Sequence, residues 1–157
     1  MSEDLPGPSR TFRMTPGRRI GDALIGQLIR VGVVPHSYLM TTIGRKTGQP
    51  RTTPVTIVEW AGRRWLVAPY GPVSWVHNAR AAGWVTLRRA GRSTRYTVRA
   101  AQPEEAGPVL KQYVEISRPT RPYFRAAPDA PVDQFIAEAD QHPVFELTPV
   151  TPASTGG

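Results

Sequence analysis

The sequence contains no cysteine among its 157 residues, and this absence excludes several classes of protein. Without thiols the chain cannot form disulfides, bind zinc through thiolates or use a cysteine nucleophile. No stretch approaches the ~20 consecutive apolar residues of a membrane-spanning helix. The first residues carry acids where a secretory signal carries bases. We therefore expect a cytoplasmic protein.

Acidic residues are also few, with 12 Asp and Glu against 20 Lys and Arg, which gives a net charge of +8. An excess of this size serves solubility, or it favours a nucleic acid, an anionic membrane surface or a polyanionic cofactor. Nucleic-acid modules carry a basic recognition helix, or aromatics interleaved with basic residues on one strand. Neither pattern is clear here, so we expect no nucleic-acid partner.

Three cations lie close together between Thr41 and Pro54. A short apolar run precedes them and a β-branched run follows them. Two glycines in this stretch can take positive φ and let a ligand approach the backbone, while lysine and arginine offer a point charge and a planar fork of donors. This is the layout of a hairpin tip that holds an anion. The glycines are Gly44 and Gly48, and the cations are Arg45, Lys46 and Arg51.

Signatures of self-sufficient catalysis are missing. We find no paired carboxylates, no Ser-His-Asp arrangement, and neither a Walker loop nor a dinucleotide fingerprint. His77 has no second ligand at metal spacing, so we predict no metal site and interpret it as structural. An anion loop without catalytic groups is typical of a cofactor enzyme, in which the protein positions a bound molecule that carries the reaction.

The pattern of apolar residues predicts an α+β protein whose antiparallel strands form a small barrel. A helix over 16–31 begins at Thr15-Pro16 and has an amphipathic face, which can dock on the domain, cover a ligand or lie on a membrane. We expect one domain over residues 15–150, with disordered tails at 1–14 and 151–157. Strands are predicted at 38–42, 51–60, 64–68, 84–89, 93–101 and 143–150, helices at 74–81 (with Ser74 as N-cap), 103–117 and 131–139, and a flap at 118–125.

Several motifs follow one another at a specific spacing: Gly44–Arg51 with Pro54, then Ala68–Gly71, then Trp75 and Asn78 ahead of the strand at Trp84. Together they closely resemble the deazaflavin-dependent nitroreductase and quinone reductase family of actinobacteria. The resemblance covers residues 20–101 and 143–149. It implies a split β-barrel, like that of flavin mononucleotide-binding proteins, with an N-terminal helix and flanking helices. It also implies coenzyme F-420, a deazaflavin with a phosphate and an oligoglutamate tail.

The same resemblance assigns the site. Lys46 and Arg51 would hold the phosphate, and Arg45 is left as a surface or tail contact. The backbone of residues 68–71 would hydrogen-bond the deazaflavin ring, with Trp75 and Asn78 at the border. The full set of expected cofactor-binding residues is Arg45, Lys46, Thr47, Arg51, Pro54, Ala68, Pro69, Tyr70, Gly71, Trp75 and Asn78.

The expected reaction is transfer of a hydride from the reduced coenzyme to a quinone, enone or nitroaromatic acceptor. Tyr70 and Tyr123 are the catalytic candidates, as proton donor or carbonyl anchor, and Phe124 could line the acceptor face with them. The segment 118–141 is longer than expected for nitro-reducing members. The resemblance therefore implies the cofactor more specifically than the acceptor.

Other functions stay open at this point. The chain could be a non-catalytic carrier of the coenzyme or of a lipid, or a binder of flavin mononucleotide or nucleic acid. The 16–31 helix allows peripheral membrane contact and hence membrane association. Neither a monomer nor a dimer is favoured by the sequence.

Overall fold

The structure is a computed structural model that describes residues 36–150. The expected 16–31 helix and both expected tails lie outside these residues. The described chain has six strands, three α-helices and two short 3-10 helices. In order they are β1 (Ser37–Ile43), β2 (Pro50–Trp60), β3 (Arg63–Val67), α2 (Ser74–Ala82), β4 (Trp84–Arg89), β5 (Arg92–Ala100), α3 (Pro103–Ile116), η2 (Arg118–Tyr123), α4 (Val132–Ala137), η3 (Ala139–Gln141) and β6 (Val144–Pro149).

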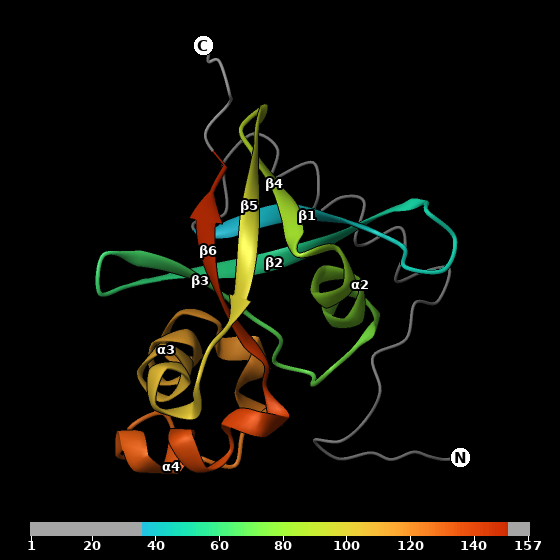
Figure 1. Ribbon diagram of the computed structural model, residues 1–157. Helices are drawn as coiled ribbons and strands as arrows, with labels where there is room; N and C mark the ends of the chain where they lie inside the picture. The colour runs from blue at the N-terminus through green and yellow to red at the C-terminus, as the bar shows by residue number, and fades with distance from the viewer. Residues whose placement is uncertain (1–35, 151–157) are drawn as a thin grey trace.

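The six strands form a closed antiparallel barrel in the order β1-β2-β3-β6-β5-β4, with β1 pairing β4 to complete the ring (Figure 1). The last strand of the chain, β6, inserts between β3 and β5, so that Leu147 pairs with Arg64 on one side and Val98 on the other. The predicted α+β architecture and the antiparallel barrel are confirmed.

The interior of the barrel is apolar because alternate residues of each strand point inward. Met40, Ile57, Leu66, Val85 and Phe145 come from five different strands, and each is at most 1% exposed. These side chains belong to one hydrophobic cluster, against which α2 packs through Val76 and Ala79. This cluster fixes α2 to the barrel, beside β1 and β4.

A second apolar cluster lies between the barrel and the C-terminal helices, where α3 and α4 pack side by side below the strands in Figure 1. Val109 and Leu110 of α3 and Phe135 of α4 are completely buried there. The first turn of α3 is closed by a capping box in which the Glu105 carboxylate accepts the Gln102 backbone N–H. No helix in residues 36–150 combines the length and hydropathy needed to cross a bilayer.

Two local expectations are wrong. Ser74 is the first helical residue of α2 and not its N-cap, a position taken by Val73 without a side-chain cap. The 118–125 segment is not a flap. Its prolines favour a 3-10 helix over a continued α-helix, Arg121 Nε donates to the Val114 carbonyl of α3 at 2.7 Å, and Phe124 is buried between Tyr113 and Phe135. Phe124 therefore cannot line an acceptor face.

Gly107 provides the close contact between α3 and α4. A Cβ at this position would overlap Ile136 Cγ1 and lie 3.3 Å from Ile136 N. We expect Gly107→Ala to destabilise the protein by about 1–3 kcal/mol, the usual cost of overpacking, although alanine is the better helix former. Thermal unfolding followed by circular dichroism measures the change.

The control is the same substitution in an Ile136→Ala background, where the overlapping methylene is gone. There Gly107→Ala should cost much less than it does alone. A gain in stability from Gly107→Ala alone would show that helix propensity decides this position and that the α3–α4 contact is looser than described.

Candidate functional site

The connection between β1 and β2 is a compact hairpin loop over residues 44–49, which we call the basic hairpin. Ile43 pairs with Pro50 at its base. Within it, Gly44 N–H donates to the Gln49 carbonyl and Gly48 N–H donates to the Gly44 carbonyl, both at 2.8 Å. Gln49 N–H donates to Thr47 Oγ1 at 3.2 Å. These bonds occupy the loop's inner polar groups, so its exposed side chains are presented outward.

The two glycines of the basic hairpin serve different purposes. Gly48 has φ +72°, a conformation that favours glycine. Gly44 does not have positive φ; a Cβ there would lie 2.7 Å from Thr47 Oγ1 and 3.3 Å from the Gln49 carbonyl oxygen. The expected positive φ thus applies to Gly48, while Gly44 allows the loop to fold tightly on itself.

Arg45 joins the basic hairpin to α2. The Oδ1 atom of Asn78, a residue only 4% exposed, accepts from Arg45 N–H at 3.1 Å and from Arg45 Nη1 at 2.8 Å. Arg45 Nη1 also lies 3.4 Å from the Ser74 carbonyl. Asn78 Nδ2 in turn donates to Thr42 Oγ1 of β1 at 3.5 Å. Arg45 is exposed, as expected of a surface residue, and its guanidinium is in addition held by the helix.

Lys46 and Arg51 are exposed like Arg45, but unlike Arg45 neither has a hydrogen-bond or ion-pair partner within residues 36–150. Arg51 lies directly opposite Thr42 in the β1–β2 register, and cross-strand partners share one face of a sheet. Since Thr42 contacts Asn78, Arg51 emerges on the side of the barrel that carries α2. Thr47 is also exposed, and Pro54 is half-buried opposite Leu39.

A second segment, Ala68–Gly71, leaves β3 and leads into α2. Ala68 N–H donates to the Pro143 carbonyl at 2.8 Å, which ties the start of the segment to the strand β6 region. Gly71 has φ +94°, and its N–H donates to the Ala68 carbonyl at 3.2 Å. Because α2 starts three residues later and also holds Arg45, this segment and the basic hairpin are connected to the same helix (Figure 1).

A buried ion pair that the sequence reasoning missed lies behind the 68–71 segment. His142 is 3% exposed and Glu138 is 2% exposed. His142 Nδ1 lies 2.9 Å from the Pro69 carbonyl oxygen, and His142 Nε2 lies 2.9 Å from Glu138 Oε1. The imidazole stacks on the Phe124 ring, with centroids 4.0 Å apart. This His142–Glu138 pair therefore connects the second core to the Pro69 carbonyl.

The hydrogen bonds around Glu138 define its charge. Burial raises the pKa of the carboxyl, but the backbone N–H of Arg125, His142 and the backbone N–H of Ala126 together lower the pKa below its usual range. An ionised carboxylate and a peptide carbonyl are both acceptors only. Both ring nitrogens of His142 therefore face acceptors, and a ring nitrogen that carries a proton donates to its partner.

One sequence signal could have pointed to this pair, namely the spacing of four between Glu138 and His142 at the end of the last helical region. The spacing says nothing of the partner, since Pro69 lies 73 residues away along the chain. Only the insertion of β6 next to β3 brings His142 to the 68–71 segment.

The two tyrosines proposed for catalysis lie together. Tyr70 and Tyr123 are half-buried, and their rings meet edge to face with centroids 4.6 Å apart. Trp75, in contrast, contributes its ring to the barrel core, 6.3 Å from the Phe145 ring, and is 9% exposed. The structure thus groups Tyr70, Tyr123 and the 68–71 segment, whereas Trp75 supports α2 from inside.

Comparison with protein families gives one match. Residues 9–127, most of the chain, match the model of a family described as F420H(2)-dependent quinone reductase. None of the curated proteins matches the sequence.

Solved structures share the fold. One, described as an F420-H2 dependent reductase, is 26% identical with a TM-score of 0.51, and the match covers 73% of this chain and 95% of that chain. Another, described as a domain-swapped dimer, is 24% identical with a TM-score of 0.52, covering 84% and 96%. A putative pyridoxamine 5'-phosphate oxidase from Listeria innocua is 11% identical with a TM-score of 0.50, covering 84% and 94%. The barrel is therefore a split barrel.

The His142–Glu138 pair predicts a pH dependence of stability. Because the pKa of Glu138 is lower in the folded protein, its ionised form stabilises the fold above the ordinary pKa of a glutamate, and this contribution is lost as the pH falls through the folded-state pKa. Glu138→Gln removes the charged acceptor of His142 and of the backbone N–H groups of Arg125 and Ala126. We expect it to lower the free energy of unfolding at pH 7 by about 3 kcal/mol, measured by urea denaturation.

As the pH falls from 6 to 3, the difference in the free energy of unfolding between wild type and Glu138→Gln should shrink. The wild type then loses the contribution of the ionised carboxylate, which the variant lacks at every pH. The matched control is Glu115→Gln on the exposed face of α3, which should change stability little at either pH. Equal stability of wild type and Glu138→Gln at pH 7 would contradict the ionised pair.

Proposed function

The chain belongs to the family of F420H(2)-dependent quinone reductases, and from this premise we propose that it reduces a small quinone, enone or nitroaromatic acceptor. It is an oxidoreductase whose cofactor is coenzyme F-420. The observation that carries the proposal is the pair of exposed cations Lys46 and Arg51, which have no partner within residues 36–150. They belong to a hairpin that is bonded to α2, the helix that the 68–71 segment enters.

The residues of the basic hairpin fit a phosphorylated cofactor. A phosphate offers only acceptors, and Lys46 and Arg51 offer three and five N–H donors. Neither side chain is neutralised by a carboxylate among the described residues, so no existing ion pair has to be broken when an anion binds. We therefore assign the cofactor phosphate to Lys46 and Arg51, with exposed Thr47 beside them.

Arg45 takes a positioning role in this proposal. Its guanidinium and backbone N–H are both bonded to Asn78 Oδ1, so it orients the basic hairpin toward α2 instead of offering a free donor. Asn78 is buried and joins Arg45 to Thr42. Holding the hairpin from behind in this way keeps Lys46 and Arg51 at a constant distance from the 68–71 segment, which favours binding through preorganisation.

The backbone of Ala68–Gly71 is proposed to hydrogen-bond the deazaflavin ring. The Pro69 carbonyl faces away from this role, because it accepts from His142. Fixing one carbonyl of a four-residue segment restricts the orientation of the neighbouring peptide groups, and the positive φ of Gly71 completes the turn into α2. The His142–Glu138 pair thus acts on the cofactor through the loop it holds, as a positioning element.

When bound, the reduced deazaflavin supplies a hydride from a ring carbon. The protein then has to hold the acceptor near that carbon and to provide a proton. Tyr70 and Tyr123 fit this task, because they lie in edge-to-face contact at the 68–71 segment and remain partly exposed. We assign the phenol of Tyr123 to the proton or to a hydrogen bond with the acceptor carbonyl, and Tyr70 to the adjoining wall.

The phosphate assignment predicts the effect of removing either cation. Lys46→Ala and Arg51→Ala should each weaken coenzyme F-420 binding by about tenfold or more, since each removes a charge-assisted hydrogen bond. Fluorescence titration of the purified protein measures the affinity. The control is Arg88→Ala, which removes the same charge from an exposed position on β4 and should change the affinity less than twofold.

A parallel titration with flavin mononucleotide tests whether the site prefers the deazaflavin ring, apart from the phosphate contact. Tighter binding of flavin mononucleotide than of coenzyme F-420 would contradict the proposed function, whereas unchanged affinity in both hairpin variants would contradict only the phosphate assignment.

The role of Tyr123 predicts a separation of rate and affinity. Tyr123→Phe keeps the aromatic edge against Tyr70 and removes only the hydroxyl. If that hydroxyl donates the proton, the single-turnover rate of reduced coenzyme oxidation by menadione should fall by about 100-fold. The Kd of the coenzyme, measured on the same variant, should change less than twofold.

An unchanged rate would show that Tyr123 is only a wall of the site. Wild-type protein that binds the reduced coenzyme but transfers no hydride to any acceptor of a broad panel would instead identify a carrier.

A further inference from the structure

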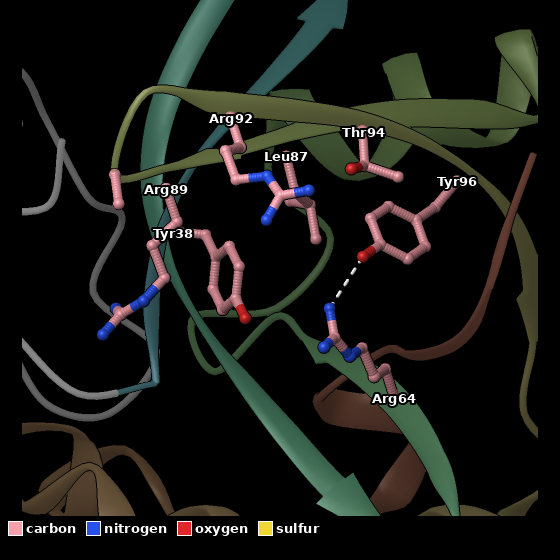
Figure 2. A pocket seen from close by; sticks show the side chains of 8 residues that line it. Tyr38, Arg64, Leu87, Arg89, Arg92, Thr94 and Tyr96 are labelled. Carbon is pink, nitrogen blue, oxygen red and sulfur yellow. Dashed lines mark hydrogen bonds between the residues drawn. The ribbon is translucent and has the colours of Figure 1, made fainter. Parts of the chain in front are cut away.

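One end of the barrel interior opens into a pocket of about 440 Å³ that is distinct from the basic hairpin. It lies at the start of β1 and at the β4–β5 turn. Roughly 16 Å of strand separates Tyr38, in this pocket, from Ile43, where the basic hairpin begins. We call it the barrel-end pocket, and Figure 2 shows its side chains. They are Tyr38, Arg64, Leu87, Arg89, Ala90, Arg92, Thr94 and Tyr96.

Three arginines occupy positions of this pocket where the strand pattern would place apolar residues. In the β4–β5 register the pairs Val85–Tyr96 and Leu87–Thr94 precede the pair Arg89–Arg92, and alternate pairs share one face. Val85, Leu87 and Tyr96 are buried in the barrel core, so the Arg89–Arg92 pair faces the interior as well. Like charges directly opposite each other are destabilising, and within the described residues Arg89 is held by the Ser37 carbonyl and the Tyr38 ring.

The third arginine reaches the pocket from the other side of the barrel. Arg64 lies two residues before the buried Leu66 on β3, and thus on the same inward face. Its Nη1 donates to the Tyr96 hydroxyl at 2.7 Å, as the dashed line in Figure 2 marks. Because that hydroxyl oxygen accepts from Arg64, its own proton remains available for an acceptor in the pocket.

The described residues offer few acidic partners to Arg64 and Arg92 in this pocket. No carboxylate lines the pocket among the described residues, and the nearest acid in contact is Glu59, an exposed side chain 3.8 Å from Arg64 Nε. Arg89 Nη1 donates to the Ser37 carbonyl at 2.8 Å, and Figure 2 shows its guanidinium turned away from those of Arg64 and Arg92. Arg92 has no hydrogen-bond or ion-pair partner within residues 36–150, and Figure 2 shows its guanidinium turned into the pocket.

The remaining lining indicates what kind of anion fits. Leu87 and the ring of Tyr38 supply apolar surface, while the hydroxyls of Thr94 and Tyr96 supply donors close to the arginine forks. A volume of this size lies within the range of small-molecule sites. Planar guanidinium groups match the two oxygens of a carboxylate or phosphate.

We propose that the barrel-end pocket is a second binding site, which takes the carboxylate or phosphate group of a small organic anion whose apolar part lies on Leu87 and Tyr38. Arg92 is the main charged contact, with Arg64 and the Tyr96 hydroxyl on the opposite side. This site is independent of the cations of the basic hairpin.

The test uses the ¹⁵N-labelled full-length protein and two probes, benzoate and inorganic phosphate, titrated by heteronuclear NMR. We expect saturable shifts of the amides of Leu87, Thr94 and Tyr96. Arg92→Gln should weaken the binding that these amides report by about tenfold or more, since it removes a charge-assisted fork. Benzoate binding alone indicates a carboxylate on an apolar body, and phosphate binding alone indicates a phosphate ester.

The matched control is Arg88→Gln, which removes the same charge from the exposed, outward-facing position next to Arg89 and should change the affinity less than twofold. A Lys46→Ala/Arg51→Ala variant should keep the shifts in the barrel-end pocket, which separates this site from the phosphate site of the basic hairpin. No saturable shift with either probe in the wild type, or an equal loss in Arg88→Gln and Arg92→Gln, would overturn the proposal. A wild-type-like spectrum of free Arg92→Gln verifies that the variant is folded.

Discussion

The two hydrogen bonds of the His142 imidazole are the interaction on which the arrangement of this protein most depends. They join a carboxylate at the end of α4 to a carbonyl between β3 and α2, across a buried boundary between two hydrophobic cores. A buried ion pair persists only where all its polar atoms are satisfied. Here the backbone N–H groups of Arg125 and Ala126 complete the shell of Glu138, so the network specifies one position of the 68–71 segment.

A buried polar side chain also holds the basic hairpin in place. Asn78 holds Arg45 and Thr42 and so fixes the hairpin to the helix that the 68–71 segment enters. Two segments are assigned to the cofactor. Asn78 holds the basic hairpin and His142 holds the 68–71 segment, and both segments are connected to α2. Lys46 and Arg51, which have no partner in the described chain, are the side chains assigned to the phosphate.

Much of the fold follows from local sequence. The β-branched run of β2 and the alternation in β4 and β5 gave correct strands, and the anion-loop composition identified the hairpin. The errors have a common physical origin in long-range packing. Phe124 was assigned to a flap because its neighbours are basic and proline-rich, whereas its burial depends on α3 and α4. His142 was missed because its partner carbonyl is near only after β6 inserts beside β3.

The most direct test of the account is a crystal structure of the protein with coenzyme F-420 bound. The account predicts that the phosphate lies within hydrogen-bonding distance of Lys46 Nζ and the Arg51 guanidinium, with the ring against the backbone of residues 68–71 and the His142–Pro69 bond intact. A phosphate held by Arg89 and Arg92 in the barrel-end pocket, or a ring that does not touch the 68–71 segment, would contradict it.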